Sequence, residues 1–200
     1  MIHRHYFFDS VRYYLDSSQS LSQEQVDGFT ALLDYFDAPA VDAAQGGWCD
    51  DRMLAYILST AWHETAFRVA PIAEYGKGAG KPYGVPVPPY GQVYYGRGFV
   101  QLTWLENYER QDDKLGLDGA LVKDADLALQ MQIATDVLFG GMRDGDFTGA
   151  KLAQFFTPDT TDWYNARTIV NGHDQASAIA DYAEKFLNAL SHTFPLPAQA

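Results

Sequence analysis

The sequence predicts an all-α, mainly helical fold with one long irregular loop and at most a short β element near residues 93–103. Apolar residues recur at helical spacing over most of the chain, which is the pattern of helices that bury one face. Residues 75–94 hold five glycines and four of the nine prolines, a density that no regular element tolerates. Only the stretch 98–103 is expected to be extended.

Three helices are expected before this loop. Ser22 opens the second of them, with Gln25 three residues later as its capping-box partner. The third runs from about Asp50 to Ala66 and is strongly apolar, and residues 38–50 form a polar connection before it. The apolar positions that define the three helices are Phe7, Phe8, Val11, Tyr14 and Leu15; Val26, Phe29, Leu32, Leu33 and Phe36; and Leu54, Ile57, Leu58, Ala61 and Trp62.

Further helices are expected after the loop. One begins near Trp104. Another is capped by Asp126 and ends at Gly140-Gly141, because glycine commonly terminates helices. Shorter helices are expected near 149–156 and 160–169.

The end of the chain closes the predicted domain. Asn171-Gly172 forms a turn, Asp174 caps a helix at 176–190, and the tail PLPAQA is frayed. At 200 residues the chain is long enough for one domain with a full core. We therefore expect a single domain over 1–200, with helices in 1–49 packed on a core formed by 50–190.

Composition narrows the classes of function. The net charge of −12 argues against nucleic acid and against anionic membranes as partners. The single cysteine, Cys49, excludes an internal disulfide and a multi-cysteine zinc site. The N-terminus lacks the pattern of a secretory signal, and no stretch is long and apolar enough for a membrane span. The expectation is a monomer that is cytoplasmic on synthesis and not inserted in a membrane.

The stretch 60-TAWHETAF-67 holds the first candidate for catalysis. Glu64 lies near the end of the most apolar helix, between Trp62 and Phe67. A carboxyl group beside aromatic rings holds its proton more tightly than one in water, as a general acid requires. A solvent-exposed glutamate at a helix end is an equally open interpretation. The zinc-protease motif His-Glu-x-x-His is excluded, because Phe67 stands where the second histidine would be.

Glu74 is the second candidate, at the start of the Gly/Pro loop. A carboxylate on a loop facing one on a helix forms a plausible acid–base pair, and a solvated loop charge is the alternative. No metal site is expected, since His3 and His5 have no acidic ligands nearby and His63 better suits a groove. Phosphate-loop and serine-hydrolase motifs are absent. Nothing around Cys49 would activate a thiol nucleophile.

The segment 94-YYGRGFVQLTWLENY-108 combines aromatic rings with hydrogen-bonding groups in fifteen residues. The segment therefore suits one wall of a groove that grips something flat, polar and extended. A well-packed aromatic core strand is the alternative, in which Tyr95 and Arg97 are buried supports.

HET at 63–65, this aromatic block and the Asn171-Gly172 turn together resemble glycoside hydrolase family 19. That family comprises chitinases and related phage or bacterial cell-wall lysins on a lysozyme-like helical fold. The resemblance covers about residues 50–190 and implies an inverting mechanism without a cofactor. Only nine residues separate the two glutamates here, where plant-type chitinases have a longer insert with disulfides. An arginine expected on the last helix is also missing.

The resemblance implies a role for each matching residue. Glu64 matches the general acid, Glu74 the general base and Thr103 the residue that helps to hold the nucleophilic water. Asp50 or Asp51 is the next candidate for the base. The implied sugar-binding residues are His63, Tyr95, Gln101, Asn107 and Asn171.

Chitin and peptidoglycan share β-1,4-linked, N-acetylated sugars, so these residues do not distinguish the two polymers. The small size, the lack of a signal sequence and the lack of a cysteine framework favour peptidoglycan, with release to the cell wall by another factor. Chitin oligomers are the alternative substrate. A non-catalytic saccharide-binding module is the alternative of another class.

Overall fold

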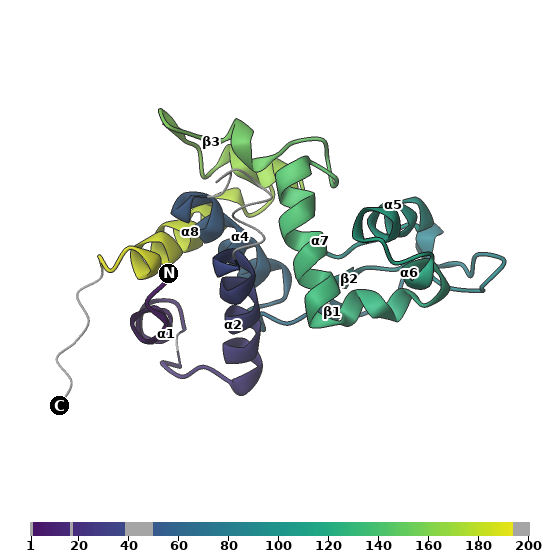
Figure 1. Cartoon of the computed structure of the whole chain (residues 1–200), viewed down its shortest axis with the longest axis horizontal. Coiled ribbons are helices and arrows are strands. Elements are labelled where there is room, and N and C mark those ends of the chain that lie inside the picture. The colour runs from purple at the N-terminus through teal and green to yellow at the C-terminus, as the bar shows by residue number, and fades with distance from the viewer. Residues whose placement is uncertain (1, 17, 39–49, 194–200) are drawn as a thin grey trace.

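Helices make up most of the computed structural model, which describes residues 2–16, 18–38 and 50–193 (Figure 1). The α-helices are α1 (Arg4–Tyr14), α2 (Gln23–Asp37), α4 (Asp51–Glu64), α5 (Leu105–Leu115), α6 (Ala120–Lys123), α7 (Met131–Asp144) and α8 (Ala176–Leu190). Short 3₁₀ helices are η1 (Pro82–Gly84), η2 (Ala125–Leu129), η3 (Leu152–Gln154) and η4 (Asn165–Ile169). The prediction of a mainly helical fold is confirmed.

Two small antiparallel sheets complete the fold. Strand β1 (Ile72–Ala73) pairs with β2 (Arg97–Gly98), and β3 (Phe156–Thr157) pairs with β4 (Thr160–Thr161). Residues 99–101 form a turn, so the prediction of an extended stretch at 98–103 was wrong beyond Gly98. The first sheet lies within the predicted β element near 93–103 and joins the segment after α4 to the start of the aromatic block. It is the element that holds the two ends of the Gly/Pro loop together.

Helix α4 lies at the centre of the core. It packs mainly against α8 and also contacts α2 and α7, while α1 packs on α8. Ten consecutive residues of α4, from Met53 to Trp62, are buried, so the strongly apolar sequence of this helix reflects burial on all sides. In Figure 1, α7 separates the group formed by α1, α2, α4 and α8 from α5 and α6.

Two helices begin at residues whose side chains cap the first backbone N–H groups. Ser22 accepts a hydrogen bond from the Gln25 backbone N–H, and the Gln25 side chain accepts one from the Ser22 N–H. This capping box was predicted and is confirmed. The Asp50 carboxylate accepts hydrogen bonds from the backbone N–H groups of Arg52 and Met53, which makes Asp50 the N-cap of α4.

The predicted ends of α7 were wrong. Asp126 does not cap it, because the helix begins at Met131 and Asp126 pairs with Arg97 at 2.7 Å instead. The helix also continues through Gly140-Gly141 to a C-cap at Gly145. Gly141 serves packing, since a Cβ there would lie 2.1 Å from the Phe147 ring. Close approach, and not helix termination, explains this glycine.

The segments after α7 also differ from the prediction. The stretches 149–156 and 160–169 contain 3₁₀ turns and the β3–β4 hairpin in place of short α-helices. Asp174 does not cap α8; the N-cap is Gln175, in a left-handed conformation. The Asp174 carbonyl instead accepts a hydrogen bond from Arg167. No side-chain cap hydrogen bond is present at the start of α8, where Gln175 stands as the N-cap.

The Gly/Pro loop has the irregular path that its composition predicts. Between residues 75 and 94 only η1 and one isolated bridge, Val87 to Gln92, interrupt it. Helix α5 begins directly after Trp104, as expected. The polar connection as far as residue 49, with Cys49 at its end, lies outside the described residues, and so does the tail 195–200.

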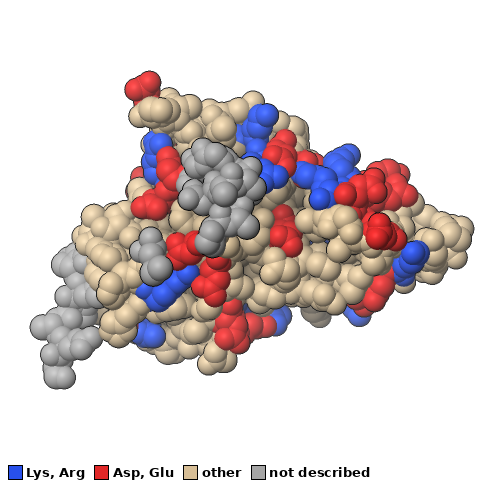
Figure 2. All heavy atoms as spheres, in the orientation of Figure 1, with Lys and Arg blue, Asp and Glu red and all other residues tan. Residues whose placement is uncertain are grey.

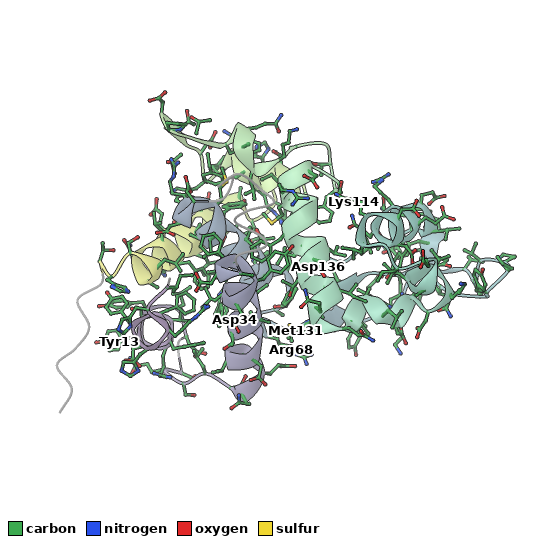
Figure 3. The ribbon with its side chains drawn as sticks, viewed as in Figure 1. Tyr13, Asp34, Arg68, Lys114, Met131 and Asp136 are labelled. Carbon is green, nitrogen blue, oxygen red and sulfur yellow. The ribbon has the colours of Figure 1, made fainter. Side chains whose placement is uncertain are left out.

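An ion pair ties α5 to α7. Its Lys114 partner, on α5, is labelled in Figure 3. The Lys114 ammonium lies 2.8 Å from the Asp144 carboxylate. Hydrogen bonds from Arg143 and then from Lys114 hold the pKa of Asp144 well below its usual range. On the face drawn in Figure 2, Lys and Arg side chains lie among Asp and Glu side chains. No helix within the described residues is long and apolar enough to cross a membrane.

Candidate functional site

Glu64 is the last residue of α4 and is partly buried, with 19% of its side chain exposed. Its Oε1 atom accepts a hydrogen bond of 2.5 Å from Nη1 of Arg167, whose side chain is only 3% exposed. The sequence had suggested aromatic surroundings for this carboxyl group. The structure gives it a buried cation, so charge pairing fixes the position of Glu64.

Arg167 connects Glu64 to the turn that contains Asn171. Its Nε atom donates to the Asp174 carbonyl at 2.9 Å, and its own carbonyl accepts from the Asn171 N–H at 3.1 Å. Asn171 is exposed, and its side chain accepts a hydrogen bond from the Gly172 N–H. The predicted turn is therefore present and is fastened to the same arginine that holds Glu64.

A strained turn follows Glu64 and leads to β1. Ala66, Phe67 and Val69 all have positive φ angles of 50–69°, which are unfavourable for residues with a Cβ atom. The buried Thr65 hydroxyl accepts a hydrogen bond from the Val69 N–H at 2.8 Å and stabilises this turn. Strain of this kind persists where the surrounding structure fixes it, and it is common at functional sites.

Glu74 lies directly after β1 and is held from two sides. The Tyr83 hydroxyl donates to its Oε1 at 3.1 Å, and the Gly96 N–H donates to its Oε2 at 3.2 Å. Burial and this hydrogen bond to Glu74 raise the pKa of Tyr83, so the phenol stays a proton donor. Glu74 is therefore anchored at the mouth of the loop, in contrast to a freely solvated charge.

Gln101 is brought to the same place through the first sheet. Its Nε2 atom donates to the Ile72 carbonyl at 3.2 Å. Its side-chain oxygen would be 2.7 Å from a Cβ on Gly96, so the amide packs directly on the glycine that binds Glu74. Gln101 and Glu74 thus share Gly96 as a common neighbour.

Thr103 and Asn107 form a second pair beside an exposed tryptophan. The Asn107 amide donates to the Thr103 carbonyl at 2.8 Å, and both residues are partly exposed. Trp104, between them in the chain, is 44% exposed and packs edge-on against Tyr83 with ring centres 5.4 Å apart. Because the Tyr83 hydroxyl also donates to Glu74, the Tyr83 ring connects Trp104 of the aromatic block to the candidate base.

Tyr95 supports the block from inside. It is 8% exposed, and the Arg97 guanidinium lies 3.5 Å above its ring. The Tyr95 carbonyl accepts from the Tyr108 hydroxyl, and burial raises the pKa of Tyr108 to about 12. The alternative in which Tyr95 and Arg97 are buried supports agrees with this geometry, and direct sugar contact by Tyr95 does not.

His63 is partly exposed on the last turn of α4, next to Glu64. Within the ranges 2–16, 18–38 and 50–193, no group of three or more His, Cys, Asp or Glu side chains could hold a metal ion. Asp50 and Asp51, the reserve candidates for the base, lie at the opposite end of α4 from Glu64. A 14-residue helix spans about 20 Å, so neither aspartate shares a site with Glu64.

Sequence reasoning missed two residues of the site. Arg167 lies 103 positions after Glu64, and Tyr83 lies within the irregular loop. Arg167 lies in a stretch of mixed polarity, four residues before the Asn171-Gly172 turn that the resemblance had singled out. No local pattern identified Tyr83, because its contact with Glu74 depends on the path of the loop.

Comparison with solved structures gives the fold a precedent. Chitinase C from Streptomyces griseus is 21% identical, with a TM-score of 0.58 over 95% of this chain and 76% of that chain. A family GH19, class IV chitinase from Zea mays is 16% identical, with a TM-score of 0.53 over 92% of this chain and 90% of that chain. No family model and no curated protein matches the sequence.

The chain therefore has the fold of the family 19 chitinases. This finding confirms the resemblance drawn from the sequence at the level of the fold. At 16–21% identity, function must be argued from the site itself.

Proposed function

We propose that this chain is a glycosidase that hydrolyses β-1,4-linked, N-acetylated sugars by an inverting acid–base mechanism. The observation that carries the proposal is a pair of carboxylates, each anchored by a different element. Glu64 is fixed by the buried Arg167, and Glu74 by Tyr83 and the Gly96 N–H. Two positioned carboxyl groups are what glycoside hydrolysis requires.

In this mechanism Glu64 protonates the glycosidic oxygen. Arg167 occupies Oε1, so we assign proton transfer to Oε2. As the proton leaves, negative charge develops on Glu64, and the guanidinium stabilises that charge in the transition state. Arg167 is therefore a positioning residue whose charge also assists the acid.

Glu74 acts as the base that removes a proton from the attacking water. The bonds from Tyr83 and Gly96 orient its carboxylate, and Thr103 helps to hold the water. Gln101, Asn107, Asn171 and His63 are proposed to bind sugar hydroxyl and N-acetyl groups. The exposed Trp104 ring adds an apolar surface for a sugar face.

We propose peptidoglycan as the polymer, reached after another factor releases the protein to the cell wall. The short connection between Glu64 and Glu74 and the single cysteine in the chain support a compact lysin-like enzyme. Chitin is the second candidate, because the similar solved structures are chitinases. A binding module without catalysis is less well supported, since binding alone does not require two anchored carboxylates.

Product analysis by mass spectrometry tests the proposal. Wild type and Glu64→Gln are incubated with purified peptidoglycan and, separately, with chitin oligomers. Muropeptides from wild type alone would support a cell-wall glycosidase, and the new reducing sugar would identify the bond. Cleavage of chitin alone would assign the second candidate. Binding without cleavage of either polymer would refute the enzymatic proposal.

A further inference from the structure

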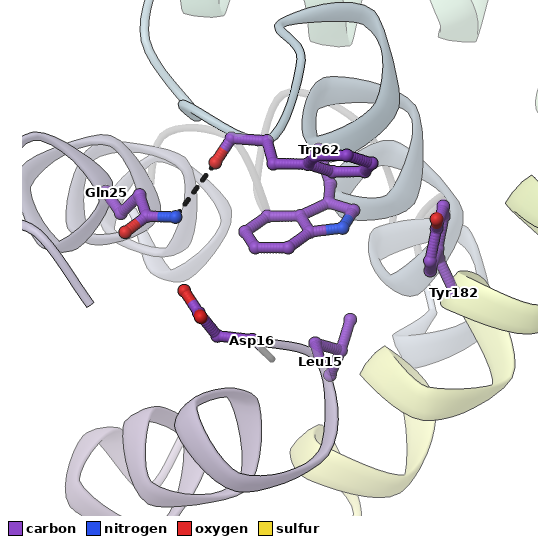
Figure 4. Close-up of a pocket in the computed structure, with 6 residues that line it drawn as sticks. Leu15, Asp16, Gln25, Trp62 and Tyr182 are labelled. Carbon is purple, nitrogen blue, oxygen red and sulfur yellow. Dashed lines mark hydrogen bonds between the residues drawn. The ribbon is translucent and has the colours of Figure 1, made fainter. Parts of the chain in front are cut away.

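A cavity of about 280 Å³ lies on the side of α4 away from Glu64 (Figure 4). Trp62 and Glu64 are two residues apart on the helix, so their side chains point about 200° apart. The cavity is bounded by the end of α1, the start of α2, the turn after α4, and α8. Its lining residues are Leu15, Asp16, Gln25, Trp62, Phe67 and Tyr182.

Aromatic rings form one wall of this cavity. The Phe67 ring lies 5.2 Å from Trp62 and 6.0 Å from Tyr182, between centres. Trp62 is 3% exposed and forms the floor, while Phe67 is 45% exposed and meets solvent. Figure 4 shows the Trp62 indole facing a space that Leu15 and Tyr182 also border. The faces of these rings carry partial negative charge.

The polar groups of the cavity add negative charge and leave few donors. Apart from the Tyr182 phenol, Asp16 is the one lining residue with an ionisable side chain. The Gln25 amide is occupied at both ends, since its oxygen accepts from the Ser22 N–H and its nitrogen donates to the Phe67 carbonyl. The chain as a whole carries a charge of −12. The cavity therefore suits a cation with an apolar surface.

We propose that this cavity binds a small quaternary alkylammonium ion. Aromatic rings attract such cations through their quadrupoles, and the Asp16 carboxylate supplies a counter-charge. A primary ammonium would need acceptors for three N–H groups, and acceptors of this lining are already occupied: Gln25 Oε1 by the Ser22 N–H and Asp16 Oδ1 by the Ser18 N–H. A quaternary nitrogen has no N–H groups and presents methyl carbons to the rings. The proposal is independent of the glycosidase proposal.

Nuclear magnetic resonance titration of the ¹⁵N-labelled full chain with choline tests the proposal. The uncharged isostere 3,3-dimethylbutan-1-ol has the same shape and serves as the matched probe. We expect choline to shift the Trp62 indole N–H signal and the alcohol to bind about tenfold more weakly, which corresponds to about 1.4 kcal/mol. Equal binding of both probes would show an apolar cavity only and would overturn the proposal, as would no binding of choline.

Two variants and one control locate the site. Asp16→Asn removes the charge but keeps the side-chain oxygen that accepts from the Ser18 N–H at 2.8 Å, and Phe67→Leu removes one ring. Each is expected to weaken choline binding by about three- to tenfold. Asp181→Asn, next to Tyr182 on α8 and outside the lining, should leave it unchanged.

The amide spectrum of each variant distinguishes a loss of folding from a loss of binding. An unchanged amide spectrum away from the cavity shows that a variant is folded, and only such variants are compared. Equal losses in Asp16→Asn and Asp181→Asn would indicate a general electrostatic effect and would overturn the site. Shifts at the cavity with N-acetylglucosamine but not with choline would assign a neutral sugar and overturn the ammonium proposal.

Discussion

The Glu64–Arg167 pair predicts a measurable coupling between two residues 103 positions apart. Replacing Arg167 by methionine keeps much of the buried volume and removes two hydrogen bonds. A bond to a charged group contributes about 2 kcal/mol and a bond to a neutral carbonyl about 1 kcal/mol. The variant should therefore lose about 3 kcal/mol of unfolding free energy, equivalent to about 6–12 °C in Tm for a chain of this size.

A double-mutant cycle isolates the pair. In the Glu64→Gln background a neutral amide oxygen replaces the carboxylate, so Arg167→Met should cost about 2 kcal/mol, about 1 kcal/mol for each bond to a neutral oxygen. The expected coupling energy is the difference, about 1 kcal/mol. Thermal and urea unfolding of the four proteins measure it. Additivity of the two changes within about 0.5 kcal/mol would refute the pairing as a stabilising interaction.

The same variants separate stability from catalysis. A misplaced acid should lower kcat about a hundredfold in Arg167→Met, with little change in KM. Arg167→Lys keeps the charge but supplies one donor group at a different position, so partial recovery of kcat is expected. A normal kcat in the folded Arg167→Met protein would remove Arg167 from the mechanism.

Four further predictions concern other parts of the chain. Glu74→Gln should lose most turnover, with partial rescue by azide; no loss would exclude it as the base. Tyr83→Phe should lower kcat about tenfold in steady-state assays, because Glu74 loses one of the two hydrogen bonds that orient it. Gly28→Ala should lower Tm by about 4–8 °C, because its Cβ would lie 1.6 Å from the Val69 carbonyl. Lys114→Met should make the free energy of unfolding fall less steeply as the pH is lowered. Its partner Asp144 has a lowered pKa, so the ion pair contributes stability above about pH 4 and loses that contribution as the pH falls.

The helices were largely predictable because burial repeats at the period of the helix. The predicted apolar positions of α4, including Leu54 and Ile57, are all buried. In α2, Phe29, Leu32 and Leu33 are buried, while Val26 and Phe36 at the margins of the stripe are partly exposed. Ser22 was predictable as a cap because its partner is three residues away. The errors arose where one residue serves a distant contact, as Asp126 does for Arg97. Local sequence does not encode such a choice between partners.

The candidate site was predictable in its residues more than in its geometry. Glu64, Glu74 and Gln101 were selected from residue type and order, and hydrogen bonds place Glu74 and Gln101 around Gly96. The bonds that position the carboxylates come from Arg167 and Tyr83, which long-range folding brings to them. Both partners depend on tertiary structure, so no spacing rule could have found them.

The contacts between α2 and the turn after Glu64 limit how this protein can be divided. Gln25 binds the Phe67 carbonyl, Glu24 pairs with Arg68, and Gly28 lies against Val69. The N-terminal helices thus hold in place the strained segment that carries the chain from one candidate carboxylate towards the other. A truncated chain that starts at Asp50 would keep both glutamates but lose the α2 contacts that stabilise the turn between them. In engineering terms α2 belongs to the same structural unit as the candidate site, and fusions or trimming are best placed elsewhere.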